Sequence, residues 1–509
     1  MMQKHKIIWG LLISILFVVV STSIFSISHY RFFDQKRIVQ SAVLVLSSLI
    51  FLTFLYENKL VGLNKFVKTG FPVFLCLLIT SAILSPLGTW AFLEIGWYLL
   101  LTELLILCAY FFIVEKEKFI KTLLFGLIAL CVLYSSRVFA DYLVGTIKDE
   151  WTTWPEQLNV RYFYKGQDIT PNGFLGFGHV RFFNHLQTWS LPLLVYAYLY
   201  FKNNLIPGLK YLLLFFIASW WMLVFAADAR GTILSSIISI IVILLLFRKK
   251  AISFFKTYST TALAGLMLYV ILFLLPKESS REILTRFGDS GRLEVWVFSL
   301  EQIVQNPWLG LGPMHFSYMG INPPWSTPHN FILQSASEWG IPAITIFIGF
   351  SVYAYFHFLK QSQSISKRDQ NVTAINWRIA LVASITAALV HSMFSGIFNS
   401  QLSQLLGVII LGAAFGDYFL NSNKKLFQTR KKISWSVYPL IILLFINTSF
   451  VAYKVISDIP HLSERQTDYM EKYRSLTLYP RFWNQGMIYE KDNDIKNEGE
   501  GKYLDGRDE

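Results

Sequence analysis

Long apolar runs separated by short polar segments are the dominant pattern of this 509-residue chain. A helix needs about 20 mainly apolar residues to cross the hydrocarbon core of a membrane, and roughly thirteen runs come close to that length. The runs lie near residues 7–27, 38–56, 70–87, 89–113, 119–141, 186–201, 210–227, 231–247, 257–275, 332–359, 378–396, 402–420 and 435–455. The pattern predicts an all-α polytopic membrane protein with about 12–13 transmembrane helices.

Composition favours the same class. Hydrophobic residues make up 54% of the chain and charged residues 15%, whereas a soluble domain carries about 25% charged residues. The formal charge of +13 could indicate a nucleic-acid partner. The basic residues, however, lie in the short segments between apolar runs, where the positive-inside rule expects them. No nucleic-acid partner is therefore expected.

The first apolar run and the cysteines exclude two further possibilities. Residues 7–27 follow Lys4 and Lys6 without a small-x-small cleavage pattern, so we expect an uncleaved first span rather than a signal peptide. The three cysteines lie inside apolar runs and lack the paired spacing of a disulfide or a zinc site.

Lysine and arginine predict the orientation, because short basic loops stay in the cytoplasm. The basic loops on the side of the N-terminus lie near residues 59–68, 116–121, 202–210, 248–256, 360–368 and 424–432. Arg31, Lys36 and Arg37 fall on the opposite side and count against this orientation. A cytoplasmic N-terminus follows, with the long loops 142–185 and 276–331 on the outer side.

The chain divides into segments on the same basis. They are transmembrane helices in 1–141, a first outer loop 142–185, transmembrane helices in 186–275, an outer loop 276–331 with an amphipathic helix, transmembrane helices in 332–455, and a polar tail 456–509. The tail is expected on the outer side, and its charged end is expected to be disordered. We expect the loop 276–331 to carry the chemistry.

Arg292 begins an amphipathic pattern in this loop. Apolar residues recur there at helical spacing, namely Leu293, Trp296, Val297, Leu300, Ile303 and Val304. Such a helix can lie along a membrane surface. A cation at a helix N-terminus is locally unfavourable, which favours a bound anion beside Arg292. The alternative is a surface arginine that pairs with a lipid phosphate or with Asp289.

Arg230 and Arg181 are the other candidate anion-binding residues. Arg230 lies in the brief polar turn FAADARGTILSS between two apolar runs, and a guanidinium binds phosphate through two parallel hydrogen bonds. It could instead pair with Asp228 or extend to the membrane interface. Arg181, in GHVRFFNHLQTWSLP, could bind substrate or serve as an interfacial anchor among aromatic residues.

His329 is the candidate general base. An imidazole, with an ordinary pKa of about 6.5, can accept a proton from a hydroxyl at neutral pH. Asn330 follows it and can cap the next helix. The alternative is a histidine at a helix start that bonds only to the backbone. His315 and His391 are weaker candidates.

Candidate chemistry is further limited by the motifs that the chain lacks. We find no HExxH, P-loop or GxSxG pattern and no outer carboxylate cluster, so no metal and no cofactor are expected. The outer compartment lacks nucleoside triphosphates, and an enzyme there needs an activated donor delivered in the membrane. A lipid-linked pyrophosphate is such a donor. Arginines would neutralise the leaving pyrophosphate while a histidine activates an acceptor hydroxyl.

Three segments together resemble the superfamily of O-antigen ligases, O-antigen polymerases and bacterial O-oligosaccharyltransferases. They are VRFFNHLQTWSLPLL, ADARGT and GRLEVW…NPWLGLGPMHF…PHNFILQSASEWG, within about residues 175–345. The superfamily motif is His, then Asn, Ser or Gln, nine residues, Gly, two residues, and Gly, Thr or Tyr. This chain has His329, Asn330 and Gly340 at the matching positions, with Ala343 in place of the last member.

The resemblance implies a type C glycosyltransferase fold in the bacterial inner membrane, with a large periplasmic catalytic loop. His329 matches the essential histidine of the family. Arg230 and Arg292 match essential arginines that contact the pyrophosphate of an undecaprenyl-linked glycan. The implied transfer inverts the sugar and needs no metal. Arg181 and Asn330 are expected to bind substrate.

The acceptor and the branch of the superfamily stay open. A ligase transfers glycan to lipid A-core, an oligosaccharyltransferase to Ser or Thr of a protein such as a pilin, and a polymerase to another lipid-linked repeat. The outward tail favours the first two slightly, and the polymerase is the alternative. A lipid-glycan flippase would need polar residues along a cavity through the membrane. Only Glu94 and Glu103 are candidates for that role.

Overall fold

The computed structural model describes a bundle of long helices. It covers residues 32–56, 59–61, 65–147, 177, 180–275, 291–318, 326–422, 427–429, 437–472 and 481–483, together with positions 13, 15 and 16. Most of the expected first span 7–27, most of the loop 142–185, parts of the loop 276–331 and the end of the tail lie outside the described residues. The uncleaved first span and the disordered end of the tail stay predictions from the sequence.

The long helices alternate with short connections. Their bounds are α2 (Phe32–Tyr56), α3 (Lys65–Leu84), α4 (Gly88–Val114), α5 (Lys116–Ile147), α7 (Val180–Phe201), α8 (Pro207–Ala226), α9 (Arg230–Phe247), α10 (Ile252–Tyr269), α13 (Ile341–Arg368), α14 (Val372–His391), α15 (Gln401–Leu420) and α16 (Val437–Asp458). The shorter helices are α11 (Arg292–Gln305), α12 (Phe331–Trp339) and α17 (Leu462–Lys472), with 3-10 turns η2 (Arg248–Ala251), η4 (His315–Ser317) and η5 (Ile459–His461) and a π turn η3 (Val270–Leu274).

The all-α polytopic architecture is confirmed. Nine helical stretches of the described chain are long and apolar enough to cross a membrane. One of them, Arg230–Phe273, contains both α9 and α10, which η2 separates. In α14 and in α15, 78% of the most apolar stretch is buried, whereas in α13 the buried share is 17%. Helices α14 and α15 therefore form the centre of the bundle, and α13 presents most of its apolar surface outward.

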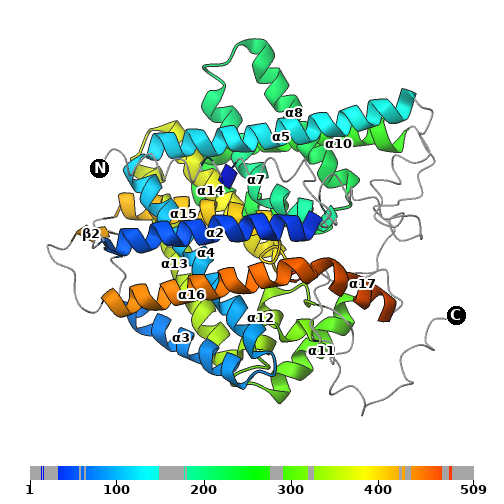
Figure 1. The fold of residues 1–509 in the computed structure, drawn as a ribbon. Helices are drawn as coiled ribbons and strands as arrows, with labels where there is room; N and C mark the ends of the chain where they lie inside the picture. Colours follow the sequence, from blue (N-terminus) through cyan, green and yellow to red (C-terminus); the bar gives the residue numbers. More distant parts are fainter. Residues whose placement is uncertain are drawn as a thin grey trace.

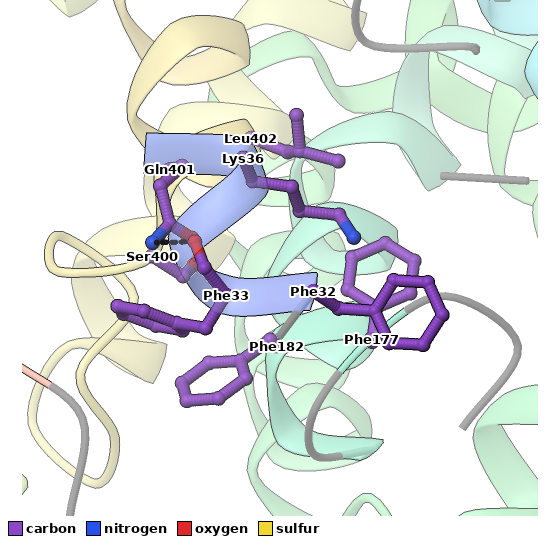
Figure 2. A pocket seen from close by; sticks show the side chains of 8 residues that line it. All are labelled: Phe32, Phe33, Lys36, Phe177, Phe182, Ser400, Gln401 and Leu402. Carbon is purple, nitrogen blue, oxygen red and sulfur yellow. Dashed lines mark hydrogen bonds between the residues drawn. The ribbon is translucent and has the colours of Figure 1, made fainter. Parts of the chain in front are cut away.

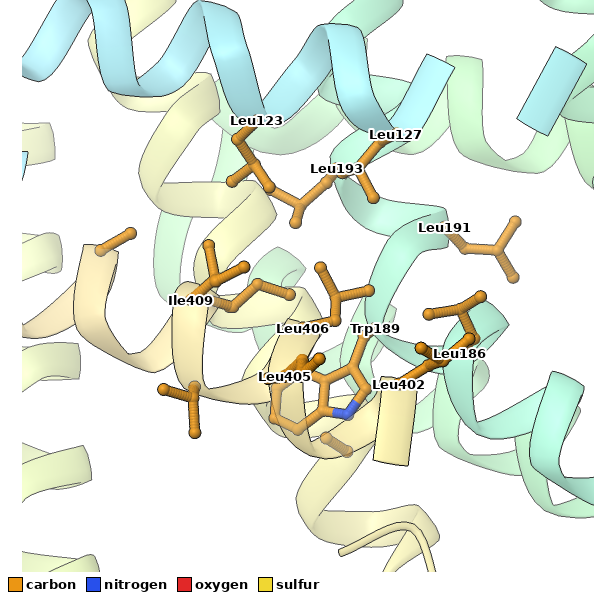
Figure 3. Close-up of a cluster of buried hydrophobic side chains, with 14 of the residues drawn as sticks. Leu123, Leu127, Leu186, Trp189, Leu191, Leu193, Leu402, Leu405, Leu406 and Ile409 are labelled. Carbon is orange, nitrogen blue, oxygen red and sulfur yellow. The ribbon is translucent and has the colours of Figure 1, made fainter. Parts of the chain in front are cut away.

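Close helix contacts build the central core. Trp189 of α7 lies among leucines of α15, including Leu405 and Leu406 (Figure 3). Gly407 permits this approach, since a Cβ there would lie 2.8 Å from the indole ring. Gly412 of the same helix faces Cys108 of α4 in the same way, at 2.6 Å. Small residues that let helix backbones approach are typical of membrane bundles.

The basic loops meet at one end of the bundle. Lys250 Nζ donates to the carbonyls of Ser366 and Asp369. Asp417 binds both Lys116, at 3.3 Å, and Arg378, at 3.0 Å. Two three-residue strands, β1 (Lys59–Val61) and β2 (Phe427–Thr429), pair antiparallel at this end (Figure 1). The sequence predicted these loops on a common side, and the structure brings them together.

Arg37 lies at the opposite end, which explains its exception to the positive-inside pattern. The side chain is buried, with 2% relative exposure. Its guanidinium donates to five acceptors, at 2.9 to 3.1 Å: the carbonyls of Asn399, Arg481 and Phe482 and the Oε1 atoms of Gln40 and Gln404. Arg37 is a structural arginine inside the protein rather than a loop residue that reports orientation.

One expected span is divided in two. The sequence predicted a single span over 332–359, but the chain forms α12 and α13, with Gly340 between them at φ 82°. A side chain at Gly340 would meet the backbone of Trp308, so the residue must be glycine. Pro342, at the start of α13, lacks the N–H that would continue α12. The break makes α12 a separate short helix that directly follows His329 and Asn330.

Candidate functional site

The predicted site residues lie at the starts of four helices. Arg181 is in the first turn of α7, Arg230 begins α9, Arg292 begins α11, and Asn330 is the N-cap of α12. The α7 helix begins at Val180, earlier than the expected span, which brings Arg181 into the helix. Helix N-termini carry partial positive charge from unpaired N–H groups. Helix N-termini and guanidinium groups both favour anions, so an anion-binding role for these residues stays a prediction.

The turn after α14 holds the start of α12. Phe331 N donates to the Ser392 carbonyl at 3.0 Å, and Asn330 Nδ2 donates to the Met393 carbonyl at 3.2 Å. Asn330 Oδ1 accepts from the backbone N–H groups of Ile332 and Leu333. The predicted cap at Asn330 is thus confirmed. One Nδ2 hydrogen remains for a substrate oxygen, so substrate binding by Asn330 stays a prediction.

His329 has an unusual backbone. Its φ is 55°, in the left-handed region that a residue other than glycine adopts at a cost of about 1–2 kcal/mol. The half-buried side chain places Nδ1 3.4 Å from Thr327 Oγ1. The preceding carbonyl, of Pro328, accepts a 2.9 Å hydrogen bond from Trp296 Nε1. Strained residues held by their surroundings occur often at functional sites, because the fold then presents the side chain in a fixed direction.

Arg292 is placed by the helix it begins. Gly291, with φ 75°, is the N-cap of α11. Val295 and Ser299 are buried, while Leu293, Val297 and Val304 are more than half exposed. This agrees with the predicted amphipathic helix, whose apolar face can rest on a membrane surface. Arg292 also lies close enough to His391 for its charge to act on that imidazole.

Arg230 begins α9 directly after a tight turn. Asp228, with φ 49°, accepts a 2.9 Å hydrogen bond from Arg230 N through its carbonyl. The Arg230 side chain is exposed. The turn places Arg230 at the exposed start of α9, and the pairing with Asp228 that the sequence left open stays an alternative.

His391 lies between the helices that carry Arg181 and Arg230. A Cβ at Gly231 would lie 2.9 Å from His391 Nε2, so the imidazole packs against the first turn of α9. His391 Nδ1 lies 2.7 Å from Thr188 Oγ1, which donates its hydrogen to the Asn184 carbonyl. The sequence ranked His391 low because nothing in its spacing reveals this packing.

His185, one turn after Arg181, packs beside His391, and we call these two buried residues the histidine layer. Its ring centroid is 5.3 Å from that of His391, with the rings edge to face. Nδ1 bonds Ser400 Oγ at 3.0 Å and Nε2 bonds Ser395 Oγ at 2.7 Å. Both ring nitrogens are occupied, which makes His185 a structural residue that fixes the first turns of α7.

A small pocket borders this layer (Figure 2). Its lining residues are Phe32, Phe33, Lys36, Phe177, Phe182, Ser400, Gln401 and Leu402. Lys36 Nζ lies 4.7 Å from the ring centroid of Phe177, and Gln401 Nε2 donates to the Phe33 carbonyl. Ser400, shared with His185, connects the pocket to the histidine layer.

Sequence reasoning missed Arg481. Its Nη2 forms ion pairs of 2.7 Å with both Glu94 Oε1 and Glu338 Oε2, and Nη1 donates to the Ser326 carbonyl at 3.1 Å. Burial raises the pKa of Glu338 to about 7, while Arg481 acts in the opposite direction. The pair with Arg481 commits Glu94, one of the flippase candidates, to a structural contact. No periodicity or motif in the polar tail distinguishes Arg481.

His315 is also buried near this cluster. Burial lowers the pKa of His315 to about 4, so the imidazole is neutral at neutral pH. It lies between Met314 and Phe316, whose N–H groups donate to Glu94 and Glu338. These contacts assign the His315 turn to the support of the site.

A comparison with protein families gives a match over part of the chain. Residues 212–348 match the O-antigen ligase family model. The matched segment contains Arg230, Arg292, His329 and Asn330, whereas Arg181 and Arg481 lie outside it. The match supports the O-antigen ligase superfamily and, with the apolar helices, a membrane glycosyltransferase of the ligase/polymerase type. No curated protein matches the chain.

Proposed function

We propose that this protein transfers a glycan from undecaprenyl pyrophosphate to an acceptor hydroxyl at the periplasmic face of the bacterial inner membrane. One observation carries the proposal. Arg181, Arg230 and His329 lie at the starts of α7, α9 and α12, which contact His391 or the turn after it, and Arg292 lies close to His391, at the end of the bundle opposite the basic loops.

The arginines would bind and stabilise the leaving group. Arg230 and Arg292 each offer a planar fork of N–H donors to pyrophosphate oxygens. The N-termini of α9 and α11 add backbone N–H groups and dipole charge in the same region. Charge develops on the bridging oxygen as the glycosidic bond breaks, so these donors lower the barrier by electrostatic stabilisation. Arg181 would hold the donor from the side of α7.

His329 would act as general base. Its imidazole accepts the proton of the acceptor hydroxyl while that oxygen forms a bond to the anomeric carbon. The bond from the anomeric carbon to the pyrophosphate oxygen breaks, and the electron pair leaves with undecaprenyl pyrophosphate. Attack from the face opposite the leaving group inverts the sugar.

The acceptor defines the branch of the superfamily. We propose lipid A-core or a serine or threonine of a pilin-like protein, with a second lipid-linked glycan, as in a polymerase, as the alternative. Deletion of the protein in its host, followed by comparison of lipopolysaccharide ladders and pilin mass, identifies the acceptor. Unshifted pilin mass with lipid A-core lacking glycan indicates the ligase, and shortened glycans on lipid A-core indicate the polymerase.

Reconstitution tests the reaction itself. Purified protein in liposomes is given labelled lipid-linked donor together with each acceptor in turn. We expect labelled acceptor and free undecaprenyl pyrophosphate. Movement of the intact donor across the bilayer, without transfer to any acceptor, would show a flippase and overturn the proposal.

A further inference from the structure

Arg481 joins three separate parts of the protein. Its side chain is 3% exposed and contacts Glu94 of α4, Glu338 of α12 and the Ser326 carbonyl. With its amide oxygen turned toward Arg481, Gln334 of α12 also accepts from both terminal nitrogens, at 2.7 and 2.8 Å. One planar guanidinium is thus bound on several sides by the elements around His329.

These contacts bracket His329 in the sequence. Ser326 precedes the histidine in its loop, and Glu338 follows it on α12. Ser326 and Glu338 both bind the planar Arg481 guanidinium, so the two ends of the segment 326–338 keep a constant separation. Since His329 itself has a left-handed backbone, a segment released at either end could relax and turn the imidazole away.

The segment that carries Arg481 is itself anchored. The carbonyls of Arg481 and Phe482 accept hydrogen bonds from Arg37 of α2. Phe482 packs edge-on against Trp97, with ring centroids 5.1 Å apart. Trp483 is 1% exposed and donates from Nε1 to Asp458 Oδ2 at 3.0 Å. These contacts fix the backbone of residues 481–483, and with it the position of the Arg481 guanidinium beside the His329 segment.

We propose that Arg481 is a positioning residue that holds His329 in its catalytic orientation, an inference that rests on the proposed function. A lysine ammonium cannot reproduce the planar fork that reaches Ser326, Glu94 and Glu338 together. A variant at this position also leaves two buried carboxylates without their shared partner, which loosens their surroundings. The effect should be on turnover, because none of these contacts involves the predicted pyrophosphate-binding arginines.

The chain offers a matched control. Arg378 is likewise buried and pairs with a single buried carboxylate, Asp417, at the opposite end of the bundle. Full-length Arg481→Lys and Arg378→Lys are compared for kcat and KM of glycan transfer per folded molecule. Hydrogen exchange is followed at the Met314 and Phe316 amides, which donate to Glu94 and Glu338. We call the Arg481 guanidinium with Glu94, Glu338 and the Ser326 carbonyl the clamp. The exchange rates of these amides report whether the clamp is intact without any catalytic assay.

We expect Arg481→Lys to lower kcat about 100-fold, as for a misplaced catalytic group, with little change in donor KM. The Met314 and Phe316 amides should exchange faster in this variant only. Arg378→Lys should retain the wild-type kcat. Equal losses of kcat in both variants, or unchanged exchange in Arg481→Lys, would overturn the proposal.

The failure of the proposed function has a different signature. In that case the wild-type protein transfers no glycan to any acceptor, while the exchange comparison still tests the clamp. If Arg481→Lys does not fold, Glu338→Gln replaces it. A glutamine keeps one oxygen for Arg481 but cannot also accept from Phe316 N, so we expect about a tenfold loss of kcat. A wild-type kcat in Glu338→Gln would contradict the clamp.

Discussion

Trp296 Nε1 donates a 2.9 Å hydrogen bond to the Pro328 carbonyl. Trp296 lies one turn after Arg292 on α11, and Pro328 directly precedes His329. This bond therefore links the helix of the predicted leaving-group arginine to the loop of the predicted base. In the proposed reaction Arg292 binds the leaving group and His329 activates the acceptor, so this bond couples the positions of the two residues.

The link predicts the effect of Trp296→Phe. Phenylalanine keeps the apolar ring but cannot donate, and a hydrogen bond of this kind contributes about 1 kcal/mol. We expect kcat to fall about fivefold, with membrane insertion unchanged. Trp308→Phe is the control, because the Trp308 ring is 75% exposed. Equal turnover of the two variants would show that the bond has no catalytic consequence.

Substitution of His329 tests the base. Asparagine tolerates a left-handed backbone, so His329→Asn removes the imidazole without adding strain at φ 55°. We expect transfer to fall about 10²–10⁴-fold, the range for loss of a general base. Thermal stability in detergent should match the wild-type protein. Near-normal glycan transfer by His329→Asn would contradict the role of His329 as the general base.

Substitution of the arginines distinguishes geometry from charge. Arg292→Lys and Arg230→Lys keep the charge but lose the two-pronged donor. We expect each to lower kcat about 100-fold, since a donor aimed at developing charge is worth that much. Arg248→Lys, in the exposed basic turn at the other end, should behave as wild type. Full activity of Arg292→Lys would mean that only charge matters there.

The packing of His391 on Gly231 gives a prediction that needs no change to a charged group. Gly231→Ala places a methyl 2.9 Å from His391 Nε2, which must displace the imidazole or the start of α9. We expect about a tenfold loss of kcat/KM, because Arg230 moves with that helix start. Gly349→Ala is the control, since a Cβ there meets nothing within 4 Å. If both variants retain activity, the site tolerates movement of His391.

Local sequence patterns predicted much of this structure. Apolar length located the long helices, basic loops predicted their shared end, and the Asn330 cap and the amphipathic α11 followed from short-range spacing. These features depend on neighbouring residues, which a sequence displays directly. The break at Gly340 has a local signal in the pair Gly340 and Pro342, but the approach of Trp308, which requires glycine there, appears in no local pattern.

Buried polar contacts were harder to predict for the same reason. Arg481 reaches Glu94 and Glu338 across long stretches of chain, and a polar tail gives no sign that one of its arginines is inside the protein. His391 similarly acquires its place from Thr188 and Gly231. Each of these residues belongs to the site through tertiary packing alone.

Arg37 has a consequence for how the protein is made. The ribosome completes α2 early, yet two of the five acceptors of Arg37 are the carbonyls of Arg481 and Phe482, near the end of the chain. Until residues 481 and 482 are synthesised, this guanidinium lacks two of its acceptors. These residues follow every helix of the described chain. Assembly of this end of the bundle therefore comes after synthesis of the helices that it joins.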